Sequence, residues 1–324
     1  MVTARGQRRT VDELGEELFL DIGDVATKRW KFTILLTLAA VIATAGVLTD
    51  STATVIGAMI VAPLGTPIIG TAFGIVISKL QRVLASAVTV LLGAAAVVAI
   101  GWLLAAVLPE VVPQARNSQV TGRTSPGLID LVAAIATGFV GAYGLARKDV
   151  SDVMPGVAIA ISLVPPLAVV GITAQAGDLD GAWGAFQLFA SNMLAMIVAG
   201  SILFTIYGYA REASEEFSRR WAYLAVGVAS FLIVVPLTVT TIQTVRRENI
   251  LDHAKDVAVA WAQGSNTHVV RTDFEGDDLI LYVEDLDDLP GGDLASELAG
   301  VAPSGTLVIV NRVGGERLDV GTVP

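Results

Sequence analysis

The residues best placed to do chemistry are prolines, glycines and hydroxyl residues inside hydrophobic segments. The stretch Gly57–Gly74 lies in an apolar run, Thr52–Ile77, that is long enough to cross a bilayer as a helix. Each proline in it lacks a backbone N–H and clashes with the preceding turn, so the helix is expected to break near its middle. In lipid, freed backbone groups need partners in the protein or in a polar cavity. A kinked packing helix is the alternative.

A second stretch repeats this pattern 99 residues later. The first set, Asp50, Thr52, Gly57 and Pro67, corresponds without a gap to Asp149, Ser151, Gly156 and Pro166. The same shift places the first expected span on the fourth and the third on the sixth. Three spans per repeat is an odd number, so the halves must enter the membrane from opposite sides. This inverted repeat is typical of many secondary transporters, and symmetric packing without transport is the alternative.

The candidate residues for a substrate or ion pathway are those at the two expected breaks, together with one amide side chain in the sixth expected span. They are Pro63, Gly65, Thr66, Pro67, Ser162, Pro165, Pro166 and Asn192. No expected span carries Lys, Arg, His or Glu near its middle, so a buried proton relay of the usual kind is absent. Backbone groups and hydroxyls remain, which suits a small ion or polar solute. For Asn192, an interhelical hydrogen bond is the preferred interpretation.

Polar pairs mark the starts of the two broken spans. They are Asp50 with Thr52, and Asp149 with Ser151. The helix dipole favours a carboxylate at a helix start, and this structural role is preferred over substrate binding. Asp130 is the one acid within an expected span, and it lies close to that span's start.

The composition indicates an integral, multi-helix membrane protein. Of 324 residues, 53% are hydrophobic and 16% are charged, and several long runs are nearly uncharged. There is no cysteine, and the two histidines, His253 and His268, lie outside the hydrophobic runs. We therefore expect no metal site and no cofactor. Neither HExxH nor GxSxG is present, so the chain is not expected to be an enzyme.

Seven apolar spans are expected in the chain. They are Phe32–Leu48, Thr52–Ile77, Val83–Val107, Leu128–Ala146, Pro155–Ala174, Phe186–Tyr209 and Trp221–Thr244, with a polar loop, Pro109–Gly127, between the halves. The expected organisation is a cytoplasmic segment (1–30), a membrane domain (31–209) of two repeats (31–107 and 128–209), a linker with the seventh span (210–244) and a soluble domain (245–324).

Basic residues predict the orientation in the cell (inner) membrane. With the N-terminus in the cytoplasm, the cytoplasmic segments hold 13 Lys and Arg residues, and the outside loops between spans hold only Arg116 and Arg123. Seven spans then place the C-terminal domain outside the cytoplasm. One span more or fewer reverses that placement.

The two ends of the chain have their own patterns. Val11–Leu20 predicts an amphipathic cytoplasmic helix that packs on the protein's own spans or, less favoured, binds a partner. From Val245 on, 15 acidic and 6 basic residues accompany an α-β-β-α-β pattern, with strands at His268–Phe274, Asp278–Glu284 and Thr306–Val310. So acidic a surface makes binding to nucleic acid unfavourable.

Three segments resemble a known family. IGAMIVAPLGTPIIG (Ile56–Gly70), GAYGLARKDV (Gly141–Val150) and MPGVAIAISLVPPLAVVG (Met154–Gly171) are similar to the bacterial and archaeal "domain of unknown function 389" family of uncharacterised hydrophobic proteins. The resemblance covers about Lys31–Tyr209. It implies a multi-pass inner-membrane protein and carries no activity.

We therefore expect a transporter or channel-like protein that passes a small ion or polar solute between the paired broken helices. The alternative is an envelope sensor or assembly scaffold whose outer domain binds a partner. Gly- and Ala-rich third and fourth spans suit close helix packing, so a homo-oligomer in the lipid bilayer is expected.

Overall fold

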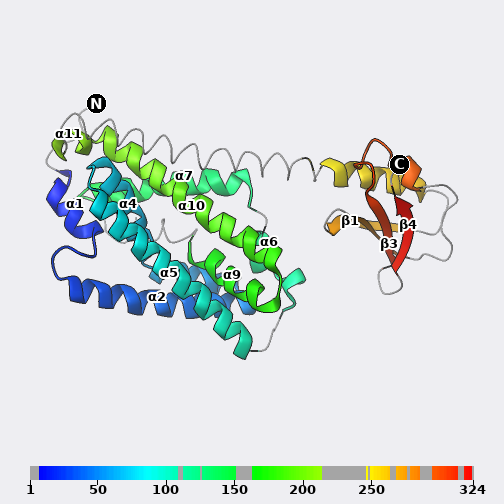
Figure 1. Ribbon diagram of the computed structural model, residues 1–324, viewed down its shortest axis with the longest axis horizontal. Coiled ribbons are helices and arrows are strands. Elements are labelled where there is room, and N and C mark those ends of the chain that lie inside the picture. Colours follow the sequence, from blue (N-terminus) through cyan, green and yellow to red (C-terminus); the bar gives the residue numbers. More distant parts are fainter. Residues whose placement is uncertain are drawn as a thin grey trace. The chain divides into compact units, whose positions relative to one another are not determined.

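The computed structural model describes residues 7–108, 112–124, 126–150, 163–213, 246, 249–262, 268–275, 278–284, 294–312 and 317–322. The chain divides into two compact units, Met1–Leu237 and Thr238–Pro324 (Figure 1). Each is considered by itself. The first is helical, and the second combines a sheet with helices.

The first unit is built from long helices joined by short turns. In chain order they are α1 (Val11–Leu18), α2 (Val25–Leu48), α3 (Thr52–Val61), α4 (Gly65–Val76), α5 (Leu80–Val107), the 3₁₀ turn η2 (Gln114–Arg116), α6 (Ser118–Thr124), α7 (Leu128–Ala146), α9 (Val164–Ala176), α10 (Leu179–Ile206) and α11 (Tyr209–Ala213).

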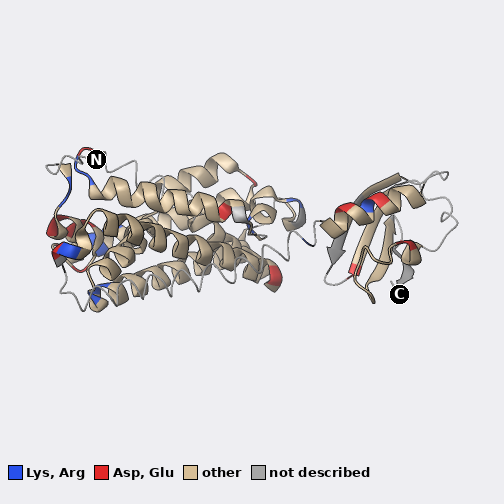
Figure 2. Ribbon diagram, turned by 90° about the horizontal axis from the view of Figure 1, so that it is seen from above, with Lys and Arg blue, Asp and Glu red and all other residues tan. Residues whose placement is uncertain are grey.

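Four of these helices, α2, α5, α7 and α10, are long and apolar enough to cross a membrane. The pair α3 and α4 is bent by 48° and counts as a fifth if it forms one broken span. Charged residues gather at the two ends of this unit, and the helices between them are almost uncharged (Figure 2). This pattern is compatible with a membrane protein.

The observed helices correct several expected bounds. α2 begins at Val25 and α10 at Leu179, each seven residues before the expected span, because Asp24 and Asp178 cap these helix starts and the first turns include polar residues that a hydrophobic run leaves out. The expected polar loop 109–127 contains η2 and α6. The first half of the fifth expected span and all of the seventh, with the boundary at Val245, lie outside the described residues.

Close backbone contacts hold the centre of the first unit. α5 packs against both α4 and α9, and α10 packs against α4, α7 and α9. A Cβ atom at Gly101 of α5 would lie 2.9 Å from the carbonyl oxygen of Ala168 in α9, and one at Gly171 would lie 2.6 Å from the amide nitrogen of Trp102. Glycine at these two positions lets the helices approach more closely than any side chain would permit.

Aromatic rings close the end of this core next to α1. Phe73 of α4 makes edge contacts with Phe204 and Tyr209, at centroid distances of 5.3 and 5.4 Å. The ring centroid of Phe19, the residue that follows α1, lies 6.0 Å from that of Phe73. The amphipathic segment therefore packs on the protein's own helices, as the preferred interpretation predicted.

The second unit is a four-stranded sheet with a helix against it. The strands β1 (His268–Glu275), β2 (Asp278–Glu284), β3 (Leu307–Arg312) and β4 (Arg317–Thr322) follow the order β1-β2-β3-β4, and only β2 and β3 are parallel. Trp261, from the helix at residues 249–261, packs with Leu281 and Val310 in the core. α13 (Leu294–Glu297) precedes β3.

β4 was absent from the sequence prediction. Its alternation is short, and the acidic Asp319 and two flanking glycines hide it, although pairing with β3 gives its backbone groups partners.

Candidate functional site

The first break separates α3 from α4. α3 ends at Val61, Ala62 is extended, and α4 begins at Gly65. By helix geometry, the last four carbonyls of α3, those of residues 58–61, have no partner within that helix. No side-chain cap covers the start of α4 at Leu64. The break therefore offers mainly backbone groups, as its sequence indicated.

Three of the four candidate prolines lie in the first turns of helices. Pro67 is the third residue of α4, and Pro165 and Pro166 are the second and third residues of α9. In a first turn the N–H has no partner inside the helix, so proline costs no helical hydrogen bond there. The expectation that Pro67, Pro165 and Pro166 free carbonyls by disrupting a helix needs correction, because they lie in first turns. Pro63 differs, because it lies just beyond the end of α3, whose last carbonyls are the free groups. The prolines instead reduce the number of N–H donors.

The pathway candidates lie at different depths. Gly65 and Pro67 are buried at the start of α4, and Pro63 and Thr66 beside them are half-buried. Pro165 and Pro166 are buried in α9, and Asn192 is 4% exposed in α10. Ser162, and likewise Ser151 of the second polar pair, lie outside the described residues.

The first break and the start of α9 belong to one core. Leu64 and Ile68 at the first break share a hydrophobic cluster with Leu163 and Leu167 at the start of α9. α5 and α10 each pack against both α4 and α9, so the candidate segments are held by the same two helices.

The polar pair at the first broken span anchors the loop that contains α6. The Asp50 carboxylate accepts hydrogen bonds from Ser118 Oγ (2.6 Å) and the Gln119 amide (3.2 Å), and Gln119 Nε2 donates to Thr52 Oγ1 (2.9 Å). Ser51, whose side chain accepts from the Thr54 amide, caps α3. Asp50 lies directly before this cap, and the Ser118 hydrogen bond lowers its pKa.

Asp149 has a different partner. Its carboxylate accepts two hydrogen bonds from the Arg147 guanidinium, one at 2.7 Å from Nε. This pairing lowers the pKa of Asp149. Asp50 and Asp149 are thus both held by other groups of the protein.

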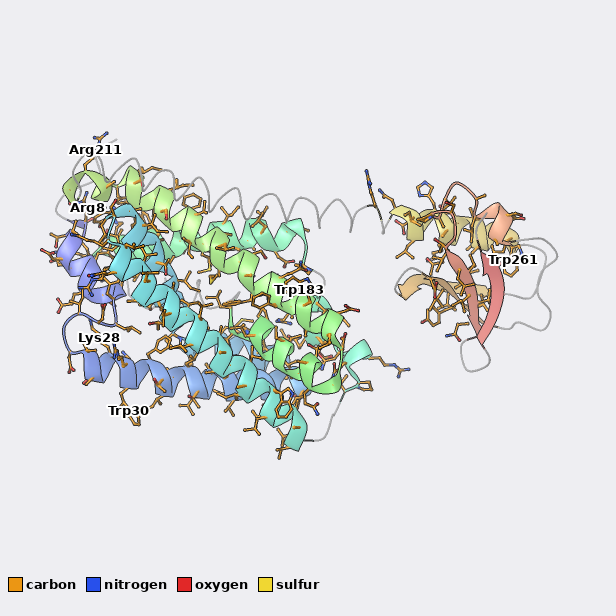
Figure 3. All side chains as sticks on the ribbon, viewed as in Figure 1. Arg8, Lys28, Trp30, Trp183, Arg211 and Trp261 are labelled. Carbon is orange, nitrogen blue, oxygen red and sulfur yellow. The ribbon has the colours of Figure 1, made fainter. Side chains whose placement is uncertain are left out.

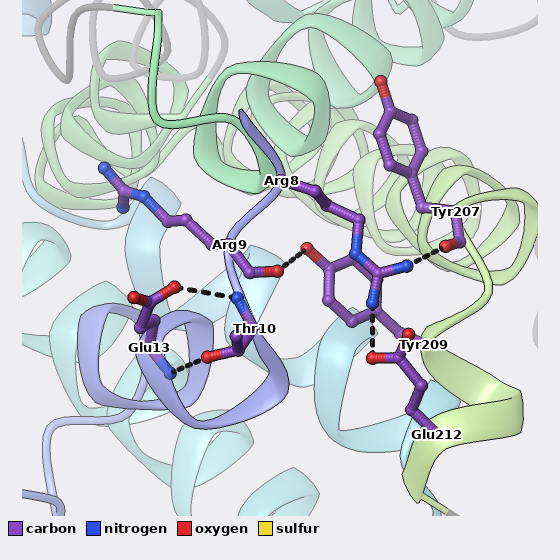
Figure 4. Close-up of polar contacts among 7 residues, drawn as sticks. All are labelled: Arg8, Arg9, Thr10, Glu13, Tyr207, Tyr209 and Glu212. Carbon is purple, nitrogen blue, oxygen red and sulfur yellow. Dashed lines mark hydrogen bonds and ion pairs between the residues drawn. The ribbon is translucent and has the colours of Figure 1, made fainter. Parts of the chain in front are cut away.

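An unanticipated polar network joins the start of the chain to the end of α10. The Arg8 guanidinium pairs with Glu212, donates to the Tyr207 carbonyl and lies 4.3 Å from the centroid of the Tyr209 ring (Figure 4). The Tyr209 hydroxyl donates to the Arg9 carbonyl at 2.8 Å. Burial raises the pKa of Tyr209 to about 12, so it remains a hydrogen-bond donor at neutral pH.

The same segment binds the end of α7. The Arg9 amide donates to the Ala146 carbonyl (2.9 Å), and the Lys148 amide donates to the Gln7 carbonyl (2.8 Å). Lys148 Nζ also pairs with Glu13 at 2.6 Å. Thr10 and Glu13 form a capping box that begins α1. The Thr10–Glu13 spacing was a readable signal for this helix start, but the long-range partners had none in the sequence.

One cavity opens beside the first break. It has a volume of about 480 Å³ and lies between α2 and α5, with Pro67 in its lining. Pro165, Pro166 and Asn192 do not line it. Within the described ranges, no three His, Asp or Glu side chains gather in a way that could hold a metal ion.

Comparisons with known proteins agree with the resemblance expected from the sequence. Residues 59–198 match the model of a family described as "Domain of unknown function (DUF389)". The chain is also similar to an uncharacterized protein of the archaeon Methanocaldococcus jannaschii, with 29% identity over 213 residues. That alignment covers 65% of this chain and 65% of the relative's length. No solved structure matches the chain.

Proposed function

We propose that this relative of the DUF389 domain is a membrane transporter or channel-like protein that passes a small ion or polar solute between its two broken spans. The main support for this proposal is that helices in the two halves begin and end at corresponding positions when the numbering is shifted by 99 residues. α5 (Leu80–Val107) maps onto α10 (Leu179–Ile206) at both ends, and α4 maps onto α9 to within one residue. The two proline-containing helix starts therefore occupy equivalent places.

The directions of the helices support an inverted repeat. α2 and α5 run away from the end that carries α1, whereas their counterparts α7 and α10 run toward it (Figure 1). The crossed packing has the same symmetry, since α5 contacts α9 of the other half and α10 contacts α4. Broken helices that meet between inverted halves are a common basis for alternating access.

The chemistry at the first break favours a cation or a hydrogen-bond donor over an anion. Four carbonyls at the end of α3 face the break region as acceptors. Proline at position 67 removes one donor from the first turn of α4, and no Lys or Arg lies between residues 32 and 78. Backbone carbonyls replace a hydration shell in this way in ion-selective pores.

Flux measurements on purified protein in liposomes test the proposal. We expect a solute- or ion-specific flux that changes in Pro67→Ala and Pro166→Ala while the folded fraction stays constant. Pro113→Ala, in the exposed loop before η2, is the matched control and should leave the flux unchanged. A broad panel of ions and small metabolites with no flux above that of empty liposomes would contradict the proposal.

An envelope sensor or assembly scaffold is the second candidate. It is favoured by the separate fold of Thr238–Pro324 and by the network that joins the chain start to α7 and α11. In the proposed seven-span topology the C-terminal domain is extracytoplasmic and the N-terminus is cytoplasmic. Deletion of Val245–Pro324 separates the two functions, because a scaffold loses its phenotype and a transporter keeps basal flux. Light scattering of the purified protein tests the proposed homo-oligomer.

A further inference from the structure

The cavity between α2 and α5 is an elongated slot. Its lining runs from Arg29 to Thr37 along α2 and from Ala85 to Ala96 along α5. These ranges correspond to about two and three helical turns, or roughly 12 and 17 Å. The shape, with a volume of about 480 Å³, suits a chain-like occupant better than a compact polar solute.

Most lining residues of the slot are apolar, and two of its four hydroxyl side chains are hydrogen-bonded within their own helices. Thr33 Oγ1 donates to the Arg29 carbonyl and Thr89 Oγ1 donates to the Ala85 carbonyl, both at 2.9 Å. Because each hydroxyl hydrogen is used within its own helix, no donor remains on these groups for an occupant. Phe32, Leu36 and Leu92 are among the apolar residues of the remaining lining.

The exposed part of the lining includes large apolar side chains next to the exposed Thr33 and Thr37. Val88 and Leu92 line the slot and are 52% and 68% exposed. In a helix that crosses a bilayer, such side chains face hydrocarbon. An occupant would therefore enter from the bilayer and not from water. This step depends on the membrane location of α2 and α5 and not on transport.

One end of the slot carries an available positive charge. Asp21 and Arg29 line this mouth, but Asp21 is already paired with Arg82. Among the described residues, Arg29 has no acidic partner. Trp30, the next residue, is 69% exposed (Figure 3), and exposed tryptophan is typical of the headgroup level of a membrane. The mouth therefore complements a negatively charged headgroup.

We propose that this slot binds an anionic membrane phospholipid, with one acyl chain between α2 and α5 and the phosphate at Arg29. Burial of the acyl chain in the slot supplies most of the binding affinity, since each CH₂ group that leaves water contributes favourably. The guanidinium supplies the preference for an anionic lipid over a zwitterionic one. Neither the family match nor the similar archaeal protein assigns a lipid site to these residues.

Native mass spectrometry of the full chain tests the proposal, with phosphatidylglycerol and phosphatidylcholine titrated separately. Arg29→Gln should weaken the binding of phosphatidylglycerol about fivefold and leave the binding of phosphatidylcholine unchanged. Lys31→Gln removes an exposed cation outside the lining and is the charge control. Wild-type affinity for phosphatidylglycerol in Arg29→Gln would overturn the assignment of the headgroup.

Filling the slot tests the acyl-chain position. Ala96→Phe places a ring in the lining and should weaken the binding of both lipids at least tenfold. Ala95 is also exposed but lies outside the lining, so Ala95→Phe should bind both lipids as the wild type does. Thr89→Leu is a second filling variant if Ala96→Phe does not fold. Unchanged binding in a folded filling variant would overturn the proposal. Displacement of phosphatidylglycerol by inorganic phosphate would also overturn it, because the site would then recognise a free anion.

Discussion

The hydroxyl of Tyr209 donates a hydrogen bond to the carbonyl oxygen of Arg9 across 200 residues of sequence (Figure 4). The bond ties the segment before α1 to the helix that follows α10. Because the Tyr209 ring also packs on Phe73 and Phe204, one side chain joins the start of the chain to both sequence halves of the helical unit.

Removing this hydroxyl should destabilise the helical unit without disturbing its packing. Tyr209→Phe keeps the ring contacts and loses one hydrogen bond, which is worth about 1 kcal/mol. We expect a lower midpoint of thermal unfolding in detergent. Tyr143→Phe, at a residue that is 43% exposed, is the control and should unfold at the wild-type temperature. An equal midpoint for Tyr209→Phe and wild type would show that the bond is energetically neutral.

Acid should weaken the attachment of α1. The hydrogen bond from Lys148 lowers the pKa of Glu13 below its ordinary value of 4.5. A carboxyl whose pKa is lower in the folded state stabilises the fold above the unfolded pKa and loses that contribution as pH falls through the folded pKa. The midpoint temperature of thermal unfolding, measured from pH 6 downward, should therefore decrease once the pH is below about 4.5. Part of this decrease should come from Glu13.

Glu13→Gln should remove this part of the acid dependence, and Asp12→Asn on the same helix should retain it. An identical pH profile for Glu13→Gln and wild type would assign the acid sensitivity to other carboxylates, such as Asp149.

Two glycines should respond in opposite ways to alanine. Gly171 of α9 lies against the backbone of α5, so a methyl group there forces the helices apart and should cost about 1–3 kcal/mol. Gly57 has no neighbouring atom within 4 Å of its Cβ position, and alanine in that helix interior should stabilise by about 0.5–1 kcal/mol. Thermal midpoints of both variants measure the difference. A Gly171→Ala protein as stable as wild type would contradict the observed helix spacing.

The sequence was most informative where structure is local. Hydrophobic length located α5 and α7, and the cluster of Pro63, Gly65 and Pro67 located the break between α3 and α4. The role of the prolines was misjudged, because a proline that interrupts a helix and one that begins it look alike in sequence. The network around Arg8 could not be predicted, since its partners lie about 200 residues away and no local pattern encodes that pairing.

Residues 99 positions apart should be accessible from opposite sides of the membrane. The chain has no cysteine, so single cysteines can be introduced without background. Gln81 is the second residue of α5 and Asp180 is the second residue of α10, and both are exposed. In the proposed inverted repeat, a membrane-impermeant maleimide added to intact cells should label Asp180→Cys and not Gln81→Cys, and cell lysis should expose the second. Arg116→Cys, in the loop expected outside, is the positive control. Labelling of both test positions from the same side would rule out the inverted repeat, whatever the flux measurements give.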